Sequence, residues 1–238
     1  MESKALRHFN VGMMIAVFLT AGILLASYLP ARASDAERVQ LLVDRARITL
    51  SDFMSDPYYS WLHDNIKHAK GVLIFPQVIK GGFIFGASGG TGVFLARDER
   101  TNNWSEPAFY TVGSATFGLQ IGGESAQVVM LAMTQKAIDS VLSSSFKLGA
   151  DASVALGPVG TGAKAQADIP SVTADFLTFA KAKGLYAGLN LEGAVIAVRD
   201  SMNNTYCRKD VRPADIILKR DCSNRGADRL REVLRRAA

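Results

Sequence analysis

The stretch that follows residue 34 alternates apolar and charged positions with the period of an α-helix. Ser34 is a candidate N-cap, acids follow in the first turn, and Asp56-Pro57 ends the pattern. A helix packed on a core and a helix lying on a membrane both fit, and the mixture of acids and bases on the polar side favours the core-packed helix. The apolar positions are Val39, Leu42, Val43, Ala46, Leu50 and Phe53, and the charged positions opposite them are Arg38, Asp44, Arg45, Arg47 and Asp52.

A second short helix is predicted from Tyr58 to His68, and from Gly71 the pattern changes to short apolar segments separated by glycine. Fifteen of the 21 glycines fall between Gly71 and Gly162. Glycine at this density indicates bulges, tight bends or close backbone approach in a strongly curved antiparallel sheet. The predicted strands are Val72 to Phe75, Phe83 to Phe85, Val93 to Ala96, Thr116 to Ile121, Val128 to Met133 and Val154 to Leu156.

Along the chain, helices are expected before, between and after the strands of this β body. Gln135 to Leu142 is predicted as a helix between strands, and the C-terminal end is also predicted to be helical. The fold class is therefore α+β, in which N-terminal helices pack on a barrel-like or sandwich-like antiparallel β body. No repeat or long polar linker interrupts the chain, so one domain is the simplest count.

The segment before residue 34 has the charge order of an export signal. Lys4, Arg7 and His8 precede an apolar run from Val11 to about Leu29, and Ala31-Arg32-Ala33 offers the small residues of a cleavage site. We therefore expect residues 1–33 to be a signal peptide cleaved near Ala33, which leaves a protein that is soluble or peripheral to a membrane. A retained anchor is the alternative, because the run approaches the roughly 20 residues that span a bilayer.

Basic residues are concentrated at the C-terminal end. The whole chain has a net charge of +5, which becomes +3 without residues 1–33, since three bases and one acid are removed. Residues 208–238 carry ten bases and five acids, so the body before them has a net charge of about −2. Such a tail suits an anionic partner such as phospholipid headgroups or nucleic acid, although a solvated helix explains it equally well.

Two cysteines, Cys207 and Cys222, enclose a loop of 14 residues. A disulfide between them is the economical interpretation in an oxidising compartment. The alternatives are a metal site or a catalytic thiol. A zinc site would need two further ligands, and the nearest histidine is far away in the sequence, so no metal site is predicted.

Enzymatic motifs lack the context that they require. Gly86-Ala-Ser88-Gly-Gly90 matches the nucleophile-elbow pattern, but a strand is predicted after it and every histidine precedes Ser88. Neither Gly86 to Gly92 nor Gly157 to Gly162 is followed by the Lys-Ser/Thr of a phosphate loop, so no nucleotide and no cofactor is predicted. His63 and His68 are five residues apart and have no third ligand in sight, so both are interpreted as surface residues.

A series of spaced motifs follows in order along the chain. The motifs are Gly71-Val-Leu-Ile-Phe-Pro76, Lys80-Gly-Gly-Phe83, Gly92-Val93, Trp104-Ser-Glu-Pro-Ala-Phe109, Gly118-Leu-Gln-Ile-Gly122, Gly157-Pro158, Gly184-Leu-Tyr-Ala-Gly188 and Leu191-Glu-Gly193. This series resembles the SYLF family of lipid-binding domains, over about Lys70 to Leu218. Two features depart from the family: Cys207 occupies a place that usually holds a second aromatic residue after Tyr206, and the basic tail from Arg220 extends past the shared region.

The resemblance implies a non-enzymatic domain that binds phospholipid, and single-domain exported members imply a periplasmic location. Residues 34–218 would form this domain and residues 219–238 the basic tail. The expected partner is anionic phospholipid or a membrane surface, with no nucleic acid; the alternative is a structural or protein-interaction module of the cell envelope. The candidate lipid-binding residues are Arg225, Arg229, Arg231, Arg235 and Arg236, with Lys70, Lys80, Lys181 and Lys183 as weaker candidates.

Overall fold

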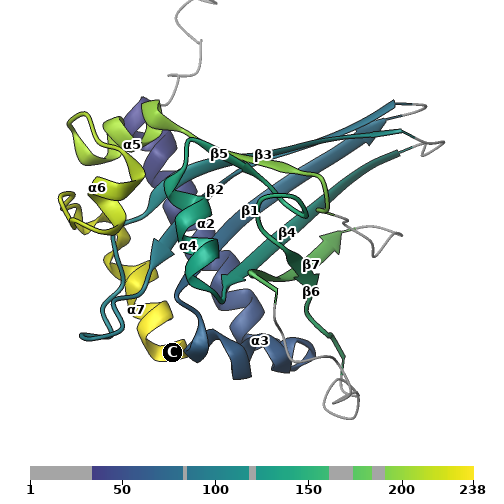
Figure 1. Cartoon of the computed structure of the whole chain (residues 1–238), viewed down its shortest axis with the longest axis horizontal. Helices are drawn as coiled ribbons and strands as arrows, with labels where there is room; N and C mark the ends of the chain where they lie inside the picture. Colours follow the sequence, from purple (N-terminus) through teal and green to yellow (C-terminus); the bar gives the residue numbers. More distant parts are fainter. Residues whose placement is uncertain (1–33, 83–84, 118–121, 161–173, 184–190) are drawn as a thin grey trace, which may run out of the picture. The chain divides into compact units, whose positions relative to one another are not determined.

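The computed structural model describes residues 34–82, 85–117, 122–160, 174–183 and 191–238 (Figure 1). The predicted signal segment 1–33 lies outside the described residues. So do Phe83 and Ile84 of one predicted strand and residues 118–121 of another. Within the described ranges, none of the helices has the length and apolar character needed to cross a bilayer.

The first described helix, α2 (Asp35–Ser55), follows the predicted periodicity. Its inward side chains Val39, Val43, Ala46, Leu50 and Phe53 are at most 3% exposed, so the core-packed alternative is confirmed. The helix ends before Pro57, because proline cannot continue the backbone hydrogen bonding.

The predicted second helix is present as three short consecutive helical elements. These are the 3₁₀ turn η1 (Pro57–Tyr59), the helix α3 (Ser60–Asn65) and the 3₁₀ turn η2 (Ile66–His68). Asp56 caps the first of them by accepting a hydrogen bond of 3.1 Å from the backbone N–H of Tyr58.

One curled sheet of eight strands forms the β body, in the order β5-β8-β3-β2-β1-β4-β7-β6. Every neighbouring pair is antiparallel except β6 and β7, which are parallel. The α+β class and the strong curvature are therefore as predicted. The strands are β1 (Gly71–Gly82), β2 (Phe85–Ala96), β3 (Ala108–Phe117), β4 (Gly122–Ala132), β5 (Ser145–Lys147), β6 (Val154–Leu156), β7 (Phe176–Lys183) and β8 (Val195–Val198).

A register shift at Pro76 in the middle of β1 explains part of the glycine content. β1 slips against both neighbours after Ile74 or Phe75 and pairs regularly again at Gln77 or Val78. Proline lacks an N–H and is tolerated inside a sheet at such irregularities. A Cβ at Gly92 would lie 2.3 Å from the carbonyl oxygen of Ile74, and one at Gly90 would lie 2.5 Å from that of Gln77. The close backbone approach predicted for glycine is present here.

The remaining helices gather over one end of the long strands (Figure 1). The opposite ends of β1 to β4 project beyond them, and along β1 the burial changes accordingly, from fully buried Val72 to Ile79, which is 56% exposed. The predicted helix from Gln135 to Leu142 is α4, with the same bounds. The other helical elements are α5 (Asp200–Cys207), α6 (Pro213–Ile217), the turn η4 (Arg225–Ala227) and α7 (Asp228–Ala237).

Several strands differ from the prediction. β3 begins at Ala108, eight residues before the predicted start at Thr116, and β5, β7 and β8 were not among the predicted strands. Ala108, Phe109 and Tyr110 are consecutive buried residues, and so are Phe176 and Leu177. Because strands covered on both faces lack the alternation of apolar and polar residues, their sequences carry no period of two.

Candidate functional site

The outward face of α2 carries a stripe of exposed basic and apolar side chains, which we call the α2 stripe: Arg38, Leu41, Arg45 and Ile48. Steps of three, four and three residues place them on one side of the helix. Leu41 is 49% exposed and Ile48 is 48% exposed. Only charged residues were predicted on this side, although the same helical spacing could have identified Leu41 and Ile48 as well.

The C-terminal segment lies beside α2. Leu230 and Leu234 of α7 are buried in the core, and α7 and η4 both contact α2. The side-chain amide of Gln40 donates a 3.0 Å hydrogen bond to the carbonyl of Gly226. The apolar face of the tail helix is therefore used by the protein's own core, which leaves only its charged side for an external partner.

The five predicted tail arginines have different surroundings. Arg225 and Arg229 are exposed, and the described residues include no ion-pair partner for either of them. Arg235 and Arg236 both pair with Glu232 one turn away on α7. Arg231 reaches into the protein and pairs with the buried carboxylate of Glu106 at 3.2 Å, as well as with Asp228. Arg225 and Arg229 are thus the two that remain available to an anion.

The weaker lysine candidates do not form one patch with the tail. Lys70 precedes β1 and pairs with Glu99. Lys80, near the other end of β1, is about 30 Å away at the rise of an extended strand. Lys183 ends β7 and is in register with Ser125 of β4. These positions are distributed along the sheet.

Lys181 has a structural contact of its own. Its ammonium lies 2.8 Å from the carboxylate of Asp56 and 5.7 Å from the ring centre of Tyr59. The hydrogen bond from Lys181 is the main reason why the pKa of Asp56 is lowered. The hydroxyl of Tyr59 donates to the carbonyl of Ala180, and burial raises its pKa to about 12. Lys181 therefore joins the turn after α2 to β7.

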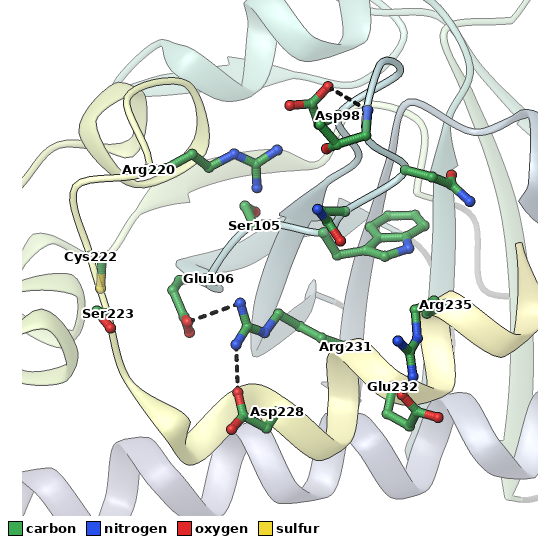
Figure 2. A pocket seen from close by; sticks show the side chains of 14 residues that line it. Asp98, Ser105, Glu106, Arg220, Cys222, Ser223, Asp228, Arg231, Glu232 and Arg235 are labelled. Carbon is green, nitrogen blue, oxygen red and sulfur yellow. Dashed lines mark hydrogen bonds and ion pairs between the residues drawn. The ribbon is translucent and has the colours of Figure 1, made fainter.

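A cavity of about 680 Å³ lies between the β2–β3 connection and the C-terminal segment (Figure 2). We call it the tail cavity. The buried carboxylate of Glu106 and the partly exposed Arg231 form an ion pair in its wall, and the hydroxyl of Tyr206 donates to Glu106 at 3.2 Å. Burial raises the pKa of Glu106, although Arg231 and Tyr206 act in the opposite direction. Figure 2 shows Arg220 reaching into the same space from the segment before Cys222.

The predicted disulfide between Cys207 and Cys222 is present and joins the end of α5 to the segment before η4. Both cysteines belong to this disulfide, and Cys222 also lines the tail cavity. The bridge therefore fixes the start of the tail next to the body.

Ser88 does not lie on a nucleophile elbow. It is inside β2, where its hydroxyl is 2.7 Å from that of Ser114 on β3. The ring Nε2 of His63 lies 2.9 Å from the carbonyl oxygen of Phe53. Over the part of the chain that the structure describes, no group of three potential ligands could hold a metal ion.

Comparison with known proteins links the chain to one family. The Ysc84 family, described as "Las17-binding protein actin regulator", matches residues 113–237, which is more than half of the 238 residues. The chain is 32% identical over 170 residues to SH3 domain-containing YSC84-like protein 1 of Bos taurus, covering 71% of this chain and 49% of that protein. It is 35% identical over 146 residues to LAS seventeen-binding protein 3 of Saccharomyces cerevisiae, covering 60% of this chain and 31% of that protein.

The chain thus spans about half the length, or less, of these curated relatives. Their printed names describe binding proteins and proteins with an SH3 domain, and neither name denotes an enzyme.

Proposed function

The chain belongs to the Ysc84 family, whose domain is the SYLF domain, and from this premise we propose that it is an exported protein that binds anionic phospholipid at a membrane surface without catalysing a reaction. The α2 stripe is the observation that carries the proposal. Leu41 and Ile48 are about half exposed, and Arg38 and Arg45 stand on the same side of the helix. A mixed apolar and basic face suits the boundary between anionic headgroups and acyl chains.

The estimated free energies of membrane binding indicate a peripheral attachment. Inserting the exposed half of Leu41 and Ile48 would contribute about 1 kcal/mol each. Each of Arg45, Arg225 and Arg229 would add about 1 kcal/mol near an anionic surface. A total of about 5 kcal/mol corresponds to a dissociation constant somewhat below 1 mM. Such binding is reversible and weakens as the salt concentration rises, as expected when a small apolar contact and a few basic side chains act together.

A protein partner is the second candidate, because the family is described as Las17-binding. In that case the same exposed residues would contact a protein of the cell envelope, and vesicles of any composition would be bound equally poorly.

Vesicle flotation with the purified protein tests the first candidate. We expect binding to vesicles that contain anionic phospholipid and little binding to purely zwitterionic vesicles. The double variant Leu41→Ser/Ile48→Ser should bind anionic vesicles about tenfold more weakly, since about 1.5 to 2 kcal/mol of apolar contact is lost. Both side chains are half exposed, so the fold should persist.

Ile79→Ser is the matched control, because Ile79 is also exposed but lies on β1, outside the α2 stripe. Its vesicle binding should equal that of the unchanged protein. If the double variant binds as well as the control, the α2 stripe is not the membrane contact. If the unchanged protein ignores anionic vesicles, the lipid proposal fails.

A further inference from the structure

We propose that two copies of the protein form a weak two-fold pair in solution, in which the α2 stripe of each copy packs on an uncovered apolar face of the other copy's sheet. We call this surface the glycine face. It lies on the part of the sheet that projects beyond the helices (Figure 1). Its residues come from β1, β2, β3 and β8 and are Ile79, Ala87, Gly89, Gly113, Ala115 and Val195.

The strand register places all six residues on one side of the sheet. One row across the sheet consists of the register partners Ile79, Gly89, Gly113 and Val195, and the next row pairs Ala87 with Ala115. Because side chains alternate along a strand, the residues in between point to the opposite side. The opposite side pairs Ser88 with Ser114 and Lys80 with Glu124. The projecting sheet therefore has one apolar side and one polar side.

Helices cover the same apolar side nearer the other end of the strands. On β4, the side-chain amide of Gln127 donates a 3.3 Å hydrogen bond to the hydroxyl of Thr49 on α2. Gln127 lies two residues after Ser125, the register partner of Ile79, so α2 is on the side of Ile79. On β3, the ring of Phe109 lies 5.3 Å from that of Tyr206 on α5, four residues before Gly113. The glycine face thus continues a surface that helices already cover.

The glycine face has an opening of the right width for one helix. Ile79 is 56% exposed and Val195 is 43% exposed, and their strands are three spacings apart, which is about 14 Å. Between them lie only Gly89 and Gly113, where an added Cβ would come no closer than 3.8 Å to any described atom. The opening between the two side chains is therefore about 10 Å wide, close to the diameter of an α-helix.

The α2 stripe is an uncovered helix face that fits this opening. Leu41 and Ile48 are both about half exposed and lie two turns apart, about 10 Å along the helix axis. Arg38 and Arg45 border them, and their long side chains can keep the guanidinium groups in water at the rim of the contact. The glycine face consists of uncharged residues only, so it offers nothing to an anionic headgroup and suits an apolar helix better than a membrane.

A two-fold pair uses both surfaces at once. Both lie on the same side of the sheet, so a rotation of 180° can bring each α2 over the glycine face of the other copy and leave no such surface open. One helix-on-sheet contact of about 19 Å by about 14 Å buries about 270 Å² on each copy. Two contacts bury on the order of 1,000 Å² in total, at the low end for specific interfaces. We therefore expect a dissociation constant on the order of 100 μM.

The pair shares the α2 stripe with the proposed lipid contact but does not depend on lipid binding. In the pair the stripe is covered, and in the single copy it is open to a membrane. At about 2 μM protein, as in a vesicle assay, fewer than about one copy in twenty would be paired. Ile79→Ser thus remains a valid control in that assay.

Sedimentation velocity tests the pairing. Protein purified from cells that express the full chain would be measured from about 5 μM to about 500 μM. We expect the average sedimentation coefficient to rise reversibly from that of one copy towards that of two. Leu41→Ser/Ile48→Ser should weaken the association by about tenfold or more, because the apolar side of the helix contact is lost.

Gly113→Val should also weaken the association by about tenfold or more, because its side chain fills the opening. The space around Gly113 is free and β-branched residues favour strands, so the fold should persist. Ser114→Val is the matched control, since it adds a similar side chain to the neighbouring position on the opposite side of the sheet. Its dissociation constant should stay within about twofold of the unchanged protein. Circular dichroism checks that both variants fold, and Ile79→Ser replaces Gly113→Val if that variant does not.

A nitroxide attached to Arg45→Cys locates the contact. The two native cysteines form the disulfide, so the new thiol is the only free one. Mixed with isotope-labelled copies that carry no nitroxide, it should broaden the amide signals of Gly89 and Gly113 at about 200 μM and lose this effect on dilution. The amides of α4 should be unaffected, because Tyr110 contacts α4 on the opposite side of the sheet.

A sedimentation coefficient that is independent of concentration up to about 500 μM would overturn the proposal. Equal weakening in Gly113→Val and Ser114→Val would overturn it as well, and so would broadening confined to α2 of the other copy, which would indicate a helix-to-helix pair. Gly113→Val should bind anionic vesicles like the unchanged protein at low concentration. Failure of the pair and failure of the lipid proposal are therefore distinguishable.

Discussion

The buried carboxylate of Glu106 determines which arginines of the tail can be replaced without disturbing the interior of the protein. Its side chain is 7% exposed, and Arg231 neutralises it from α7, 125 positions later in the chain. Replacing all five tail arginines at once would therefore combine a surface effect with a buried one. Only Arg225 and Arg229 can be replaced as a clean test of tail electrostatics.

The variant Arg231→Gln should lower the free energy of unfolding by about 2 to 3 kcal/mol near neutral pH, because it leaves a buried carboxylate with fewer partners. The pKa of Glu106 in the folded protein lies above its ordinary value of 4.5, and the loss of Arg231 raises it further. Stability contributed by such a group falls as pH rises from the unfolded pKa through the folded pKa. The cost should thus be larger at about pH 7 than at about pH 5.

Urea unfolding at both pH values measures this effect, with exposed Arg229→Gln as the control expected to change stability by less than about 0.5 kcal/mol. A cost for Arg231→Gln no larger than that of the control would mean that the Glu106 pair does not stabilise the fold.

At the scale of elements, Asp175 joins three of them. Its carboxylate accepts hydrogen bonds from the hydroxyl of Thr134, the N-cap of α4, at 2.6 Å, and from the backbone and hydroxyl of Ser153 before β6 at 2.8 Å. Asp175 itself precedes β7. Burial alone would raise the pKa of Asp175, but these hydrogen bonds outweigh it and lower the pKa.

Asp175→Asn should reduce the free energy of unfolding by about 2 kcal/mol, because charged hydrogen bonds are lost. A lowered folded pKa gives stability that is complete above the unfolded value of 3.8 and disappears as pH falls through the folded pKa. The difference between Asp175→Asn and the unchanged protein should therefore shrink below about pH 4. Thermal unfolding measures it, and exposed Asp139→Asn on α4 is the control. A difference that is constant with pH would contradict a role for the ionised carboxylate.

The disulfide is the second connection at this scale. Reduction should destabilise the protein by about 3 kcal/mol, the chain-entropy value for a loop of this length. Amide hydrogen exchange should accelerate in α6, η4 and α7 more than in β1 to β4, because the bridge restrains only the C-terminal end. Labelling of the unfolded, unreduced protein provides the control, since two reactive thiols per chain would refute the bridge.

For the whole molecule, export is the main untested expectation. If residues 1–33 are a signal peptide, the accumulated protein should begin at Ser34 and fractionate with the periplasm or the membrane surface. Intact mass measurement and cell fractionation test this. A chain that retains Met1 and resists extraction from the inner membrane would instead identify an anchor. Salt should release a mature peripheral protein but not an anchored one.

Local sequence patterns predicted several elements well. The helix α4 has the predicted bounds, and α2 buries the predicted face. The disulfide followed from having two cysteines and an expected oxidising compartment. The start of β3 and the whole of β7 were missed because buried strands have no alternating pattern. The exposed Leu41 and Ile48 were assigned to neither face of the helix, although the helical spacing places them with Arg38 and Arg45.

The sequence by itself determined the fold class, the helical faces, the glycine-rich curved sheet and the family, since each depends on residue order and spacing over short distances. Only the tertiary structure decided that the apolar face of α7 is used by the core and that Arg231 is structural. These outcomes depend on burial and on contacts between residues more than 100 positions apart, such as Arg231 with Glu106. The free energy of a charged side chain is set by such surroundings, and spacing along the chain does not encode them.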